Sequence, residues 1–377
     1  MEFLLAVSIL LVCHAYFGYP FSLWAIGVFR SRPVRRGAFH PPVTFLITAH
    51  NEGASIREKL KNTLQLRYPG DALQILVASD GSTDDTNDIV REYSDHGGVE
   101  LLEIHERGGK ERAQKVALEN AQGEIVVFSD VATRIDPGGL EQIISNFADP
   151  SVGCVSSQDV LIGRDGRPSG EGFYVRYEMM LRRLETRVHS LVGLSGSFFA
   201  ARREVCKDFS PEMQSDFRTL LNSIKMGLRG VTDPNAVGYY TDVSDPQREF
   251  ERKVRTVVRG LTVFFRHLDL LNPFRFGLFS YQLFCHKLLR WLVPFWLVTA
   301  LVSNFFLMTQ SMFLFALLLG QIIFYGTAIW GWAADRWERS VLIKIPTFFV
   351  MVNASIAAAW VQYLSGRRVV MWKPSTR

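Results

Sequence analysis

Long apolar segments lie at the two ends of the chain, and a charged middle separates them. Apolar residues concentrate in about the first thirty and the last hundred of the 377 positions. A helix of about 20 apolar residues is long enough to cross a bilayer. This distribution is typical of a membrane-anchored enzyme or receptor, so we expect membrane helices on both sides of a water-exposed domain.

The first apolar segment, Phe3–Phe29, predicts the permanent anchor of a multi-pass protein rather than a cleaved signal peptide. A signal peptide has a basic start and a small-residue cleavage site, whereas this chain begins with Glu2 and carries its basic residues afterwards. Those residues are Arg30, Arg32, Arg35 and Arg36. Basic residues mark the cytoplasmic side and attract anionic headgroups. We therefore expect a cytoplasmic middle domain, the plasma (inner) membrane as location and membrane lipids as partners.

Three more spans are predicted at the other end: Trp291–Met308, Met312–Ala334 and Ile345–Leu364. With one anchor, three spans put the carboxyl terminus outside, yet its basic residues favour the inside. These residues are Arg367, Arg368, Lys373 and Arg377. Either the charge rule is overridden or one segment is re-entrant or interfacial. Ile345–Leu364 is the candidate, because Asn353 and Ser355 make it the least uniformly apolar.

Charge and cysteine content exclude some functions for the middle domain. The net charge of +5 is slight, and no basic and aromatic module of a nucleic-acid-binding type is present. Four cysteines stand far apart, without the spacing of a metal site or a disulfide framework: Cys13, Cys154, Cys206 and Cys285. We therefore expect no nucleic acid partner and a reducing compartment.

From Pro42 onward, strand and helix patterns alternate. The predicted strands are Val43–Thr48, Gln74–Ser79, Val99–Ile104 and Glu124–Ser129, and the predicted helices lie near Ser55–Leu66, Asp84–Ser94 and Lys110–Ala121. Such alternation predicts an α/β fold with a parallel sheet and right-handed crossovers.

Two later stretches have apolar residues at helical spacing. Glu171–Leu191 is interpreted as a helix that covers the sheet. Glu249–Leu271 carries an apolar face from Phe250 to Leu268, and arginines and Lys253 occupy much of its remainder. Because an apolar segment follows soon after, a helix lying in the membrane interface is slightly favoured over a core helix.

The fourth predicted strand is a buried apolar run that ends abruptly at Asp130. In open α/β sheets, ligands collect beyond the carboxyl ends of parallel strands. Asp130 could there bind a cation and its phosphates, or it could cap a helix near Pro137. Taken alone, the residue favours the cap.

Three other polar pieces follow or accompany the predicted strands: Thr48–Glu52, Asp80–Asp84 and Gly108–Lys110. Each has a purely structural interpretation, because Asp-Gly pairs form turns and Ser82 or Thr83 can cap a helix. Together on one sheet edge they fit a nucleotide-sugar site. Asp80 would accept a base N–H, Lys110 and the adjacent helix start would bind a diphosphate, and Asp130 would bind a metal through oxygen.

These pieces carry a family resemblance. The chain resembles the membrane-bound family-two glycosyltransferases, whose catalytic domain has the GT-A (Rossmann-like) fold. The matching residues are TAHNE at Thr48–Glu52, DGSTD at Asp80–Asp84, GGK at Gly108–Lys110 and FSD at Phe128–Asp130. Gly196–Arg202 resembles the acceptor-side glycine segment, and Gln214–Phe217 stands where the family has an acidic pair. The resemblance covers about Pro42 to Leu271.

The resemblance implies an inverting transfer of a sugar from a nucleoside diphosphate, UDP above all, with Mg²⁺ or Mn²⁺ bound. Asp216 would be the general base, and Asp130 would bind the metal. The residues on the donor side would be Thr48, His50, Asn51, Glu52, Asp80, Gly81, Ser82, Lys110 and Asp130. Those on the acceptor and diphosphate side would be Gly196, Ser197, Arg252 and Arg255.

The chain departs from the family pattern at two positions. The family commonly has a D-x-D motif that begins at the position of Asp130. This chain has Ala132 in the third place of that motif, so one metal ligand is missing. The Q-x-x-R-W motif of the processive synthases reads Arg252 to Thr256 here, and only Arg255 matches. The second departure favours the transfer of one sugar to a lipid-linked or glycan acceptor over polymer synthesis.

The sequence therefore predicts four regions and leaves three functions to weigh. The regions are an anchor (1–30), a cytosolic GT-A domain (40–247), an amphipathic interface helix (248–275) and a membrane region of about three spans (276–377). A non-processive glycosyltransferase of cell-surface glycan or exopolysaccharide synthesis is favoured. The alternatives are a processive polysaccharide synthase that exports its polymer and a catalytically silent nucleotide-binding scaffold.

Overall fold

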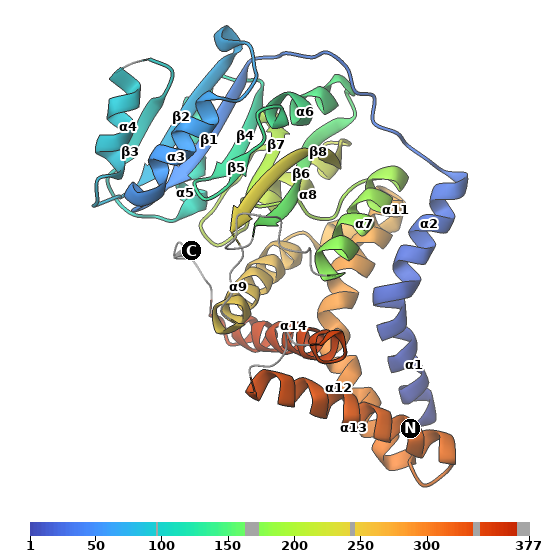
Figure 1. The fold of residues 1–377 in the computed structure, drawn as a ribbon. Coiled ribbons are helices and arrows are strands. Elements are labelled where there is room, and N and C mark those ends of the chain that lie inside the picture. Colours follow the sequence, from blue (N-terminus) through green and yellow to red (C-terminus); the bar gives the residue numbers. More distant parts are fainter. Residues whose placement is uncertain (96, 163–172, 242–245, 335–339, 368–377) are drawn as a thin grey trace. The chain divides into compact units, whose positions relative to one another are not determined.

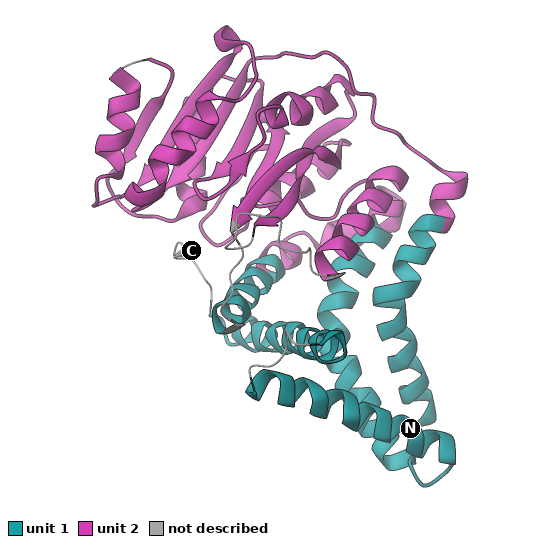
Figure 2. Ribbon diagram, in the orientation of Figure 1, with its two compact units in different colours: residues 1–24, 244–261, 280–368 teal, residues 25–243, 262–279, 369–377 magenta. Residues whose placement is uncertain are grey.

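The computed structural model describes residues 1–377 except 96, 163–172, 242–245, 335–339 and 368–377. Arg368, Lys373 and Arg377 of the predicted basic tail lie outside the described residues. The chain forms two compact units (Figure 2), which we describe separately. Unit 1 comprises Met1–Trp24, Ser244–Leu261 and Ser280–Arg368, and unit 2 comprises Ala25–Val243, Thr262–Phe279 and Val369–Arg377.

Unit 2 is built on one sheet, which has eight strands within the described residues, in the order β3-β2-β1-β4-β7-β6-β8-β5 (Figure 1). The strands are β1 (Val43–Ala49), β2 (Leu73–Asp80), β3 (Glu100–Ile104), β4 (Ile125–Asp130), β5 (Arg134–Ile135), β6 (Val152–Ile162), β7 (Phe198–Arg202) and β8 (Arg229–Thr241). The α/β class and the first four predicted strands are confirmed, with bounds that move by one residue.

The prediction of a parallel sheet is correct for the four strands on which it was based, β3, β2, β1 and β4, but it does not hold for the whole sheet. β7 pairs antiparallel with β4 and with β6, and β5 pairs antiparallel with β8, while β6 and β8 are parallel. The reason is that β7 follows α7 and a loop that return the chain along β4 in the opposite direction. The alternation of strands and helices near the start of the domain carried no signal of this reversal.

Helices cover both faces of the sheet, and strand alternation decides which residues face which layer. Phe45 and Ile47 of β1 face one core cluster, whose helical members come from α3, α4 and α6. Leu46 of β1 and Phe128 of β4 face the other, with members from α5 and α8. The helices are α3 (Gly53–Leu64), α4 (Thr86–Asp95), α5 (Lys110–Asn120), α6 (Gly139–Ser145), α7 (Phe173–Val188) and α8 (Ser215–Lys225).

The described residues contain four helices that are long and apolar enough to cross a membrane: Glu2–Phe29, Leu278–Leu307, Met312–Ala333 and Val341–Leu364. The first comprises α1 (Glu2–Cys13), a π-helical turn and α2 (Tyr19–Phe29), and the second comprises α11 (Leu278–Leu283), a π-helical turn and α12 (Arg290–Leu307). The others are α13 (Met312–Ala333) and α14 (Val341–Leu364). One amino-terminal and three carboxyl-terminal membrane helices are therefore confirmed, and the chain is a membrane protein.

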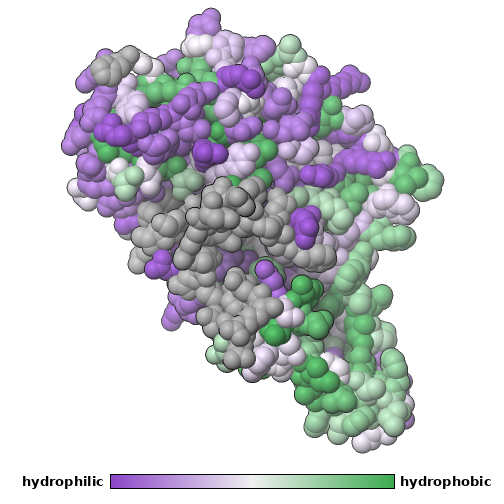
Figure 3. All heavy atoms as spheres, in the orientation of Figure 1, coloured by the Kyte–Doolittle hydropathy of each residue, from purple (hydrophilic) through white to green (hydrophobic). Residues whose placement is uncertain are grey.

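The surface of these helices is largely apolar, whereas the surface over the sheet is largely hydrophilic (Figure 3). Inside unit 1, polar side chains pair with one another: the Tyr281 hydroxyl lies 2.6 Å from Ser22 Oγ and 3.4 Å from His14 Nε2. Such pairs satisfy polar groups that hydrocarbon would leave without partners.

The second span begins at Leu278, so the prediction of Trp291 was too late. His286, Lys287 and Arg290 lower the apparent hydropathy there, yet His286 and Arg290 are buried inside the unit. The Arg290 guanidinium lies 5.5 Å from the centre of the Tyr16 ring. Packing against the first span thus accommodates charges that a hydropathy pattern counts against a membrane helix.

The last span is one continuous helix in spite of its polar residues. Asn353 Nδ2 donates to Phe349 O at 2.9 Å, and Ser355 Oγ donates to Val352 O at 2.7 Å. Both side chains return to their own helix and therefore leave its backbone hydrogen bonding intact. The side of the membrane on which the chain ends stays a prediction.

The predicted interface helix is α9 (Pro246–Phe265), and a 3₁₀ turn at Leu268–Leu271 follows it. Its first half has an exposed polar side, but residues 258–264 of its second half are all buried, and Arg259 is only 8% exposed. Arg259 is therefore not a solvated residue of the polar face, as the sequence pattern had indicated.

Candidate active site

The ends of the central strands bring the predicted site residues to one edge of the sheet. Thr48 of β1 pairs in register with Asp130 at the end of β4, and Ala49 pairs with Ser79 of β2. The loops after β1, β2 and β4 therefore start side by side, as expected for parallel strands.

The loops after β1 and β2 are held together by hydrogen bonds between them. The ring nitrogen His50 Nδ1 lies 2.6 Å from Asp80 O. Asn51, which has a positive φ of 51°, donates its N–H to Ser82 Oγ at 3.1 Å and accepts the Thr83 N–H at 2.8 Å. Local side-chain bonds of this kind stabilise loops against other conformations. We call residues 48–53 and 80–86 the β1–β2 corner.

Asp84 holds the first turns of two helices in this corner. Its carboxylate accepts the Gly53 N–H of α3 at 2.9 Å and the Thr86 N–H of α4 at 3.1 Å. The Thr86 hydroxyl in turn accepts the Glu52 N–H at 2.8 Å. Burial by itself would raise the pKa of Asp84, but these hydrogen bonds outweigh it and lower the pKa. The sequence suggested Ser82 or Thr83 for the capping role that Asp84 takes.

The Asp80 carboxylate binds the backbone of the Gly-Gly loop. Its two oxygens accept the N–H groups of Gly108 at 2.8 Å and Gly109 at 2.7 Å, and the residue is 3% exposed. Gly81 is required beside it, because its φ is +62° and a Cβ there would lie 2.8 Å from Arg107 N. Asp80 therefore places the start of α5, and with it Lys110.

Lys110 and Asp130 form an ion pair at the end of β4. Lys110 Nζ donates to Asp130 Oδ1 and, at 3.0 Å, to Gly196 O. Burial by itself would lower the pKa of Lys110, but the charge and the hydrogen bond of Asp130, with smaller contributions from nearby acids, together outweigh burial and hold the pKa above its ordinary value. The Asp130 N–H donates to Ser197 O at 3.0 Å, so the Gly196–Ser197 segment runs directly along this pair.

Asp216 lies on the other side of Gly196. It is in the first turn of α8, where its Oδ1 accepts the Phe217 N–H at 2.6 Å. Its Oδ2 would be 2.8 Å from a Cβ added to Gly196. The charge of Asp216 also contributes to the raised pKa of Lys110. Gly196 thus lets a carboxylate approach the Lys110–Asp130 pair closely.

A second lysine, Lys59 of α3, lies buried beneath the loop after β4. It is 3% exposed, and its ammonium donates to Ser129 Oγ and Thr133 O, both at 2.6 Å. Burial lowers its pKa to about 7, although the charge of Asp130 opposes that shift. We call Lys59, Lys110, Asp130, Gly196 and Asp216 the β4 corner.

A family model described as "Glycosyl transferase family 2" matches residues 44–209. This range contains both corners except Asp216. Residues 44–209 form a family-two glycosyltransferase domain.

Relatives and a solved structure agree with this assignment. The glycosyltransferase domain is 29% identical over 115 residues to a poly-β-1,6-N-acetyl-D-glucosamine synthase of Staphylococcus aureus (strain COL), covering 30% of this chain and 27% of that protein. The corresponding Staphylococcus epidermidis synthase is 25% identical over 171 residues, covering 44% and 40%. The matches thus span about a quarter to two fifths of these relatives.

Similarity to a solved structure extends over nearly the whole chain. A mannosyltransferase from Pyrobaculum calidifontis, solved with GDP-Man and Mn²⁺, is 25% identical, with a TM-score of 0.72 and coverage of 97% of this chain and 99% of that one. The predicted GT-A fold with flanking membrane helices is therefore confirmed.

Sequence reasoning missed two residues of the glycosyltransferase domain, Lys59 and Asp159. Asp159 of β6 accepts the hydroxyls of Ser195 at 2.7 Å and Ser157 at 3.2 Å. Burial raises its pKa, the charge of Arg182 opposes this only in part, and the charge of Asp130 adds to it. A signal existed for Lys59, which falls on the buried face of α3 between Ile56 and Thr63. Asp159 follows the polar residues Ser156 to Gln158, so it did not stand out in the sequence.

The metal-ligating side chains of the glycosyltransferase domain fit a divalent cation only together with a bound substrate. Among the described residues, no group of three or more His, Cys, Asp or Glu could hold a metal. Asp130 is the one carboxylate in the predicted metal position, and Ala132 adds no oxygen ligand. Mg²⁺ in proteins is often bound by one or two carboxylates plus substrate phosphates. Asp130 therefore fits a cation that binds with a diphosphate.

The remaining predicted residues, Arg252 and Arg255, belong to unit 1. Arg252 pairs with Glu249 on its own helix, with Arg252 Nε 2.7 Å from Glu249 Oε2. Burial lowers the pKa of Arg255, and the charges of Arg259 and Arg252 lower it further. Their part in donor or acceptor binding stays a prediction.

Proposed function

We propose that the chain is an inverting glycosyltransferase that moves one sugar from a nucleoside diphosphate donor to a lipid-linked acceptor. The reaction would serve cell-surface glycan or exopolysaccharide synthesis, with the catalytic domain on the cytoplasmic side of the plasma membrane. The observation that carries the proposal is the β4 corner, where the Asp216 carboxylate and the Lys110–Asp130 pair meet across Gly196. A general base (Asp216), an ammonium group (Lys110) and a second carboxylate (Asp130) at one sheet edge suit the transfer of a sugar away from a diphosphate.

In the proposed reaction, Asp216 accepts the proton of the acceptor hydroxyl. The acceptor oxygen then forms a bond to the anomeric carbon, and the bond from that carbon to the diphosphate breaks on the opposite face. The electron pair of the broken bond leaves with the diphosphate, whose charge the Lys110 ammonium stabilises. Opposite faces of attack and departure make the transfer inverting.

A bound Mg²⁺ or Mn²⁺ would be held by Asp130 and the donor phosphates, and it would offset the charge of the leaving diphosphate. Lys110 already neutralises Asp130 in part. This lysine must therefore share the carboxylate with a cation or turn toward the phosphates when the donor binds.

The β1–β2 corner would bind the base and ribose of the donor. Asp80 would accept a base N–H in addition to its two backbone bonds, since each carboxylate oxygen can accept more than one hydrogen. The other donor-side residues of this corner are Thr48, His50, Asn51, Glu52, Gly81 and Ser82. We favour UDP as the nucleotide; the Pyrobaculum calidifontis mannosyltransferase was solved with GDP-Man, so both are to be tested.

The second candidate is a processive synthase, favoured by the similarity to the staphylococcal poly-β-1,6-N-acetyl-D-glucosamine synthases. Against it stands Thr256, in the place of the tryptophan of the processive motif. A single transfer is therefore our proposal, and product length decides between the two.

The test uses the purified full-length protein with UDP-, GDP- and dTDP-sugars, Mn²⁺ or Mg²⁺ and a lipid acceptor. Release of nucleoside diphosphate is the readout. Asp216→Asn should lower release by about 10²- to 10⁴-fold, the typical contribution of a general base, while donor binding persists. Asp71→Asn, which changes an exposed acid of the same unit, is the matched control.

Three outcomes would contradict the proposal. Unchanged release by Asp216→Asn would remove the base from the mechanism. Absence of donor binding to the wild type would favour the silent scaffold. Products that lengthen with time, without added partners, would favour the processive synthase.

A further inference from the structure

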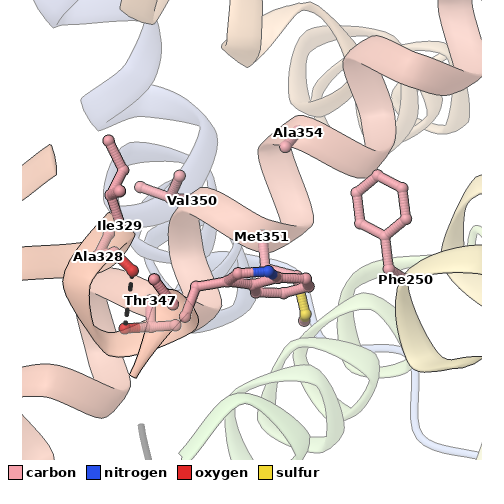
Figure 4. A pocket seen from close by; sticks show the side chains of 9 residues that line it. Phe250, Ala328, Ile329, Thr347, Val350, Met351 and Ala354 are labelled. Carbon is pink, nitrogen blue, oxygen red and sulfur yellow. Dashed lines mark hydrogen bonds between the residues drawn. The ribbon is translucent and has the colours of Figure 1, made fainter. Parts of the chain in front are cut away.

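A narrow apolar cavity lies within unit 1, between α9, α13 and α14 (Figure 4). Its volume is about 260 Å³. The lining residues are Phe250 of α9, Ala328, Ile329, Trp332 and Ala333 of α13, and Thr347, Val350, Met351 and Ala354 of α14. We call it the α9 groove.

The α9 groove offers little to water. The Thr347 hydroxyl is engaged with Ala328 O at 3.5 Å, and the other lining side chains, apart from the Trp332 indole N–H, carry no hydrogen-bonding group. A buried water needs two to four polar partners. The groove therefore favours a hydrocarbon occupant.

Small side chains keep the α9 groove open while the helices around it stay in contact. Thr347 packs closely on Gly331: a Cβ added at Gly331 would lie 2.4 Å from the Thr347 hydroxyl oxygen. Phe250 and Trp332 meet edge to face, with ring centres 6.3 Å apart, and link α9 to α13. Ala328, Ala333 and Ala354 leave the space between these contacts unfilled.

The rim of the α9 groove is cationic. Lys253 Nζ lies 5.2 Å from the centre of the Phe348 ring, and Phe348 follows the lining residue Thr347. Lys253 and Arg252 share one acid, Glu249, at 3.0 and 2.7 Å. From Glu249 to Arg255, α9 carries two acids against three cations: Arg252, Lys253 and Arg255. An apolar groove with this rim complements an amphiphile with an anionic head.

We propose that the α9 groove binds the hydrocarbon chain of the lipid acceptor and that Lys253 and the neighbouring arginines of α9 bind its phosphate. The proposal rests on the proposed function, because it names the chemical class of the acceptor's carrier as a polyprenyl phosphate; the hydroxyl that attacks the donor lies on a sugar linked to that phosphate. Pockets for small ligands have volumes of about 300–1,000 Å³, so a cavity near the lower limit suits one chain rather than a two-chain phospholipid.

The test measures binding of a labelled long-chain polyprenyl phosphate to the purified full-length protein in detergent. Ala354→Trp fills the α9 groove from an exposed position and should weaken binding at least about tenfold. Ala316→Trp places the same side chain at another exposed position of unit 1, on α13 and outside the lining, and should leave binding unchanged. Thermal unfolding checks that both variants fold.

Two further measurements test the head and the chain. Lys253→Met should weaken the binding of polyprenyl phosphate but not that of the phosphate-free polyprenol, because only the phosphate carries a charge that the Lys253 ammonium can bind. Phosphatidylglycerol should compete poorly. Unchanged binding by Ala354→Trp, or equal competition by phosphatidylglycerol, would overturn the proposal.

The outcomes also separate this proposal from the proposed function. If the wild-type protein binds the lipid in the groove but transfers no sugar, the groove proposal is supported and the glycosyltransferase proposal is contradicted. If the wild-type protein transfers sugar but Ala354→Trp binds the lipid normally, the proposed function is supported and the groove proposal is contradicted.

Discussion

The two corners of the candidate active site are stabilised in different ways. In the β1–β2 corner, short polar side chains and backbone groups satisfy one another, and Asp80 and Asp84 bind neutral N–H groups. In the β4 corner, full charges face one another: Lys110 pairs with Asp130, and Lys59 lies buried nearby with its pKa lowered by burial. The first corner is preorganised, and the second is a balance of charges.

The difference suits two tasks. A base and a ribose keep their charge during the reaction, so a site that binds them benefits from rigid hydrogen bonds. A diphosphate gains charge as it leaves, so its site benefits from cations that can redistribute. We therefore expect substitutions in the β4 corner to act on rate and those in the β1–β2 corner to act on stability and donor binding.

The largest effect is expected from Lys110→Met. The change removes the cation that we assign to the leaving diphosphate, and it should lower kcat/KM by about 10²- to 10³-fold, as for other preorganised charge-stabilising groups. Steady-state release of nucleoside diphosphate measures it. Lys115→Met, at an exposed position of the same helix, is the control. A Lys110→Met enzyme with near-normal activity would show that charge in this corner is structural.

Gly196→Ala should lower kcat by about 10- to 100-fold, corresponding to about 1.4–2.7 kcal/mol in the barrier. The new Cβ would stand 2.8 Å from Asp216 Oδ2, so the carboxylate must turn away from the reacting hydroxyl. Thermal stability should change little, because the end of a side chain can move. Gly70→Ala, where a Cβ meets nothing within 4 Å, controls for loss of a glycine. Equal kcat in the two variants would contradict the assigned position of the base.

Asp80→Asn should destabilise the fold by about 2 kcal/mol and raise the KM for the donor. An amide cannot accept with both of its ends, so one of the two glycine N–H groups loses its buried acceptor. Chemical denaturation in detergent and donor titration measure the two effects. Asp95→Asn, an exposed acid at the end of α4, is the control. If Asp80→Asn lowered kcat alone, the two corners would not differ as we describe.

The smallest effect concerns pH and Lys59. Its pKa is about 7 in the fold and 10.5 ordinarily, so between these values the unfolded chain binds a proton that the folded chain does not. The free energy of unfolding of the wild type should therefore rise with pH, by about 1–2 kcal/mol from pH 7 to 8.5, relative to Lys59→Met. Below pH 7 both states are protonated and the cost of burying the charge is fully present. Parallel pH curves for the two proteins would show that Lys59 stays charged.

The β1–β2 corner was largely predictable from sequence, because its signals are local. Strand ends, Asp-Gly and the Gly-Gly before Lys110 lie within a few residues of the positions they determine. The capping role of Asp84 was not predictable, because it depends on the angle at which α3 and α4 start beside each other.

The β4 corner was predictable only in part. Asp130 and Lys110 stood out by family resemblance, but their direct ion pair depends on parallel pairing of β1 with β2 and β4. Lys59 lies 71 positions before Asp130 in the chain, and its burial depends on how α3 packs on the sheet. The second half of the sheet was not foreseen, because antiparallel pairing of β4 with β7 joins segments about 70 residues apart.

Asp84 has a consequence for how the domain opens. One carboxylate binds the first turns of both α3 and α4, through Oδ2 to Gly53 and Oδ1 to Thr86, so fraying of either helix at its amino end frees one side of the residue that also holds the other. The segment from β1 to α4 should therefore exchange its amide hydrogens as one cooperative block. Local opening that admits a substrate would therefore begin outside the segment from β1 to α4.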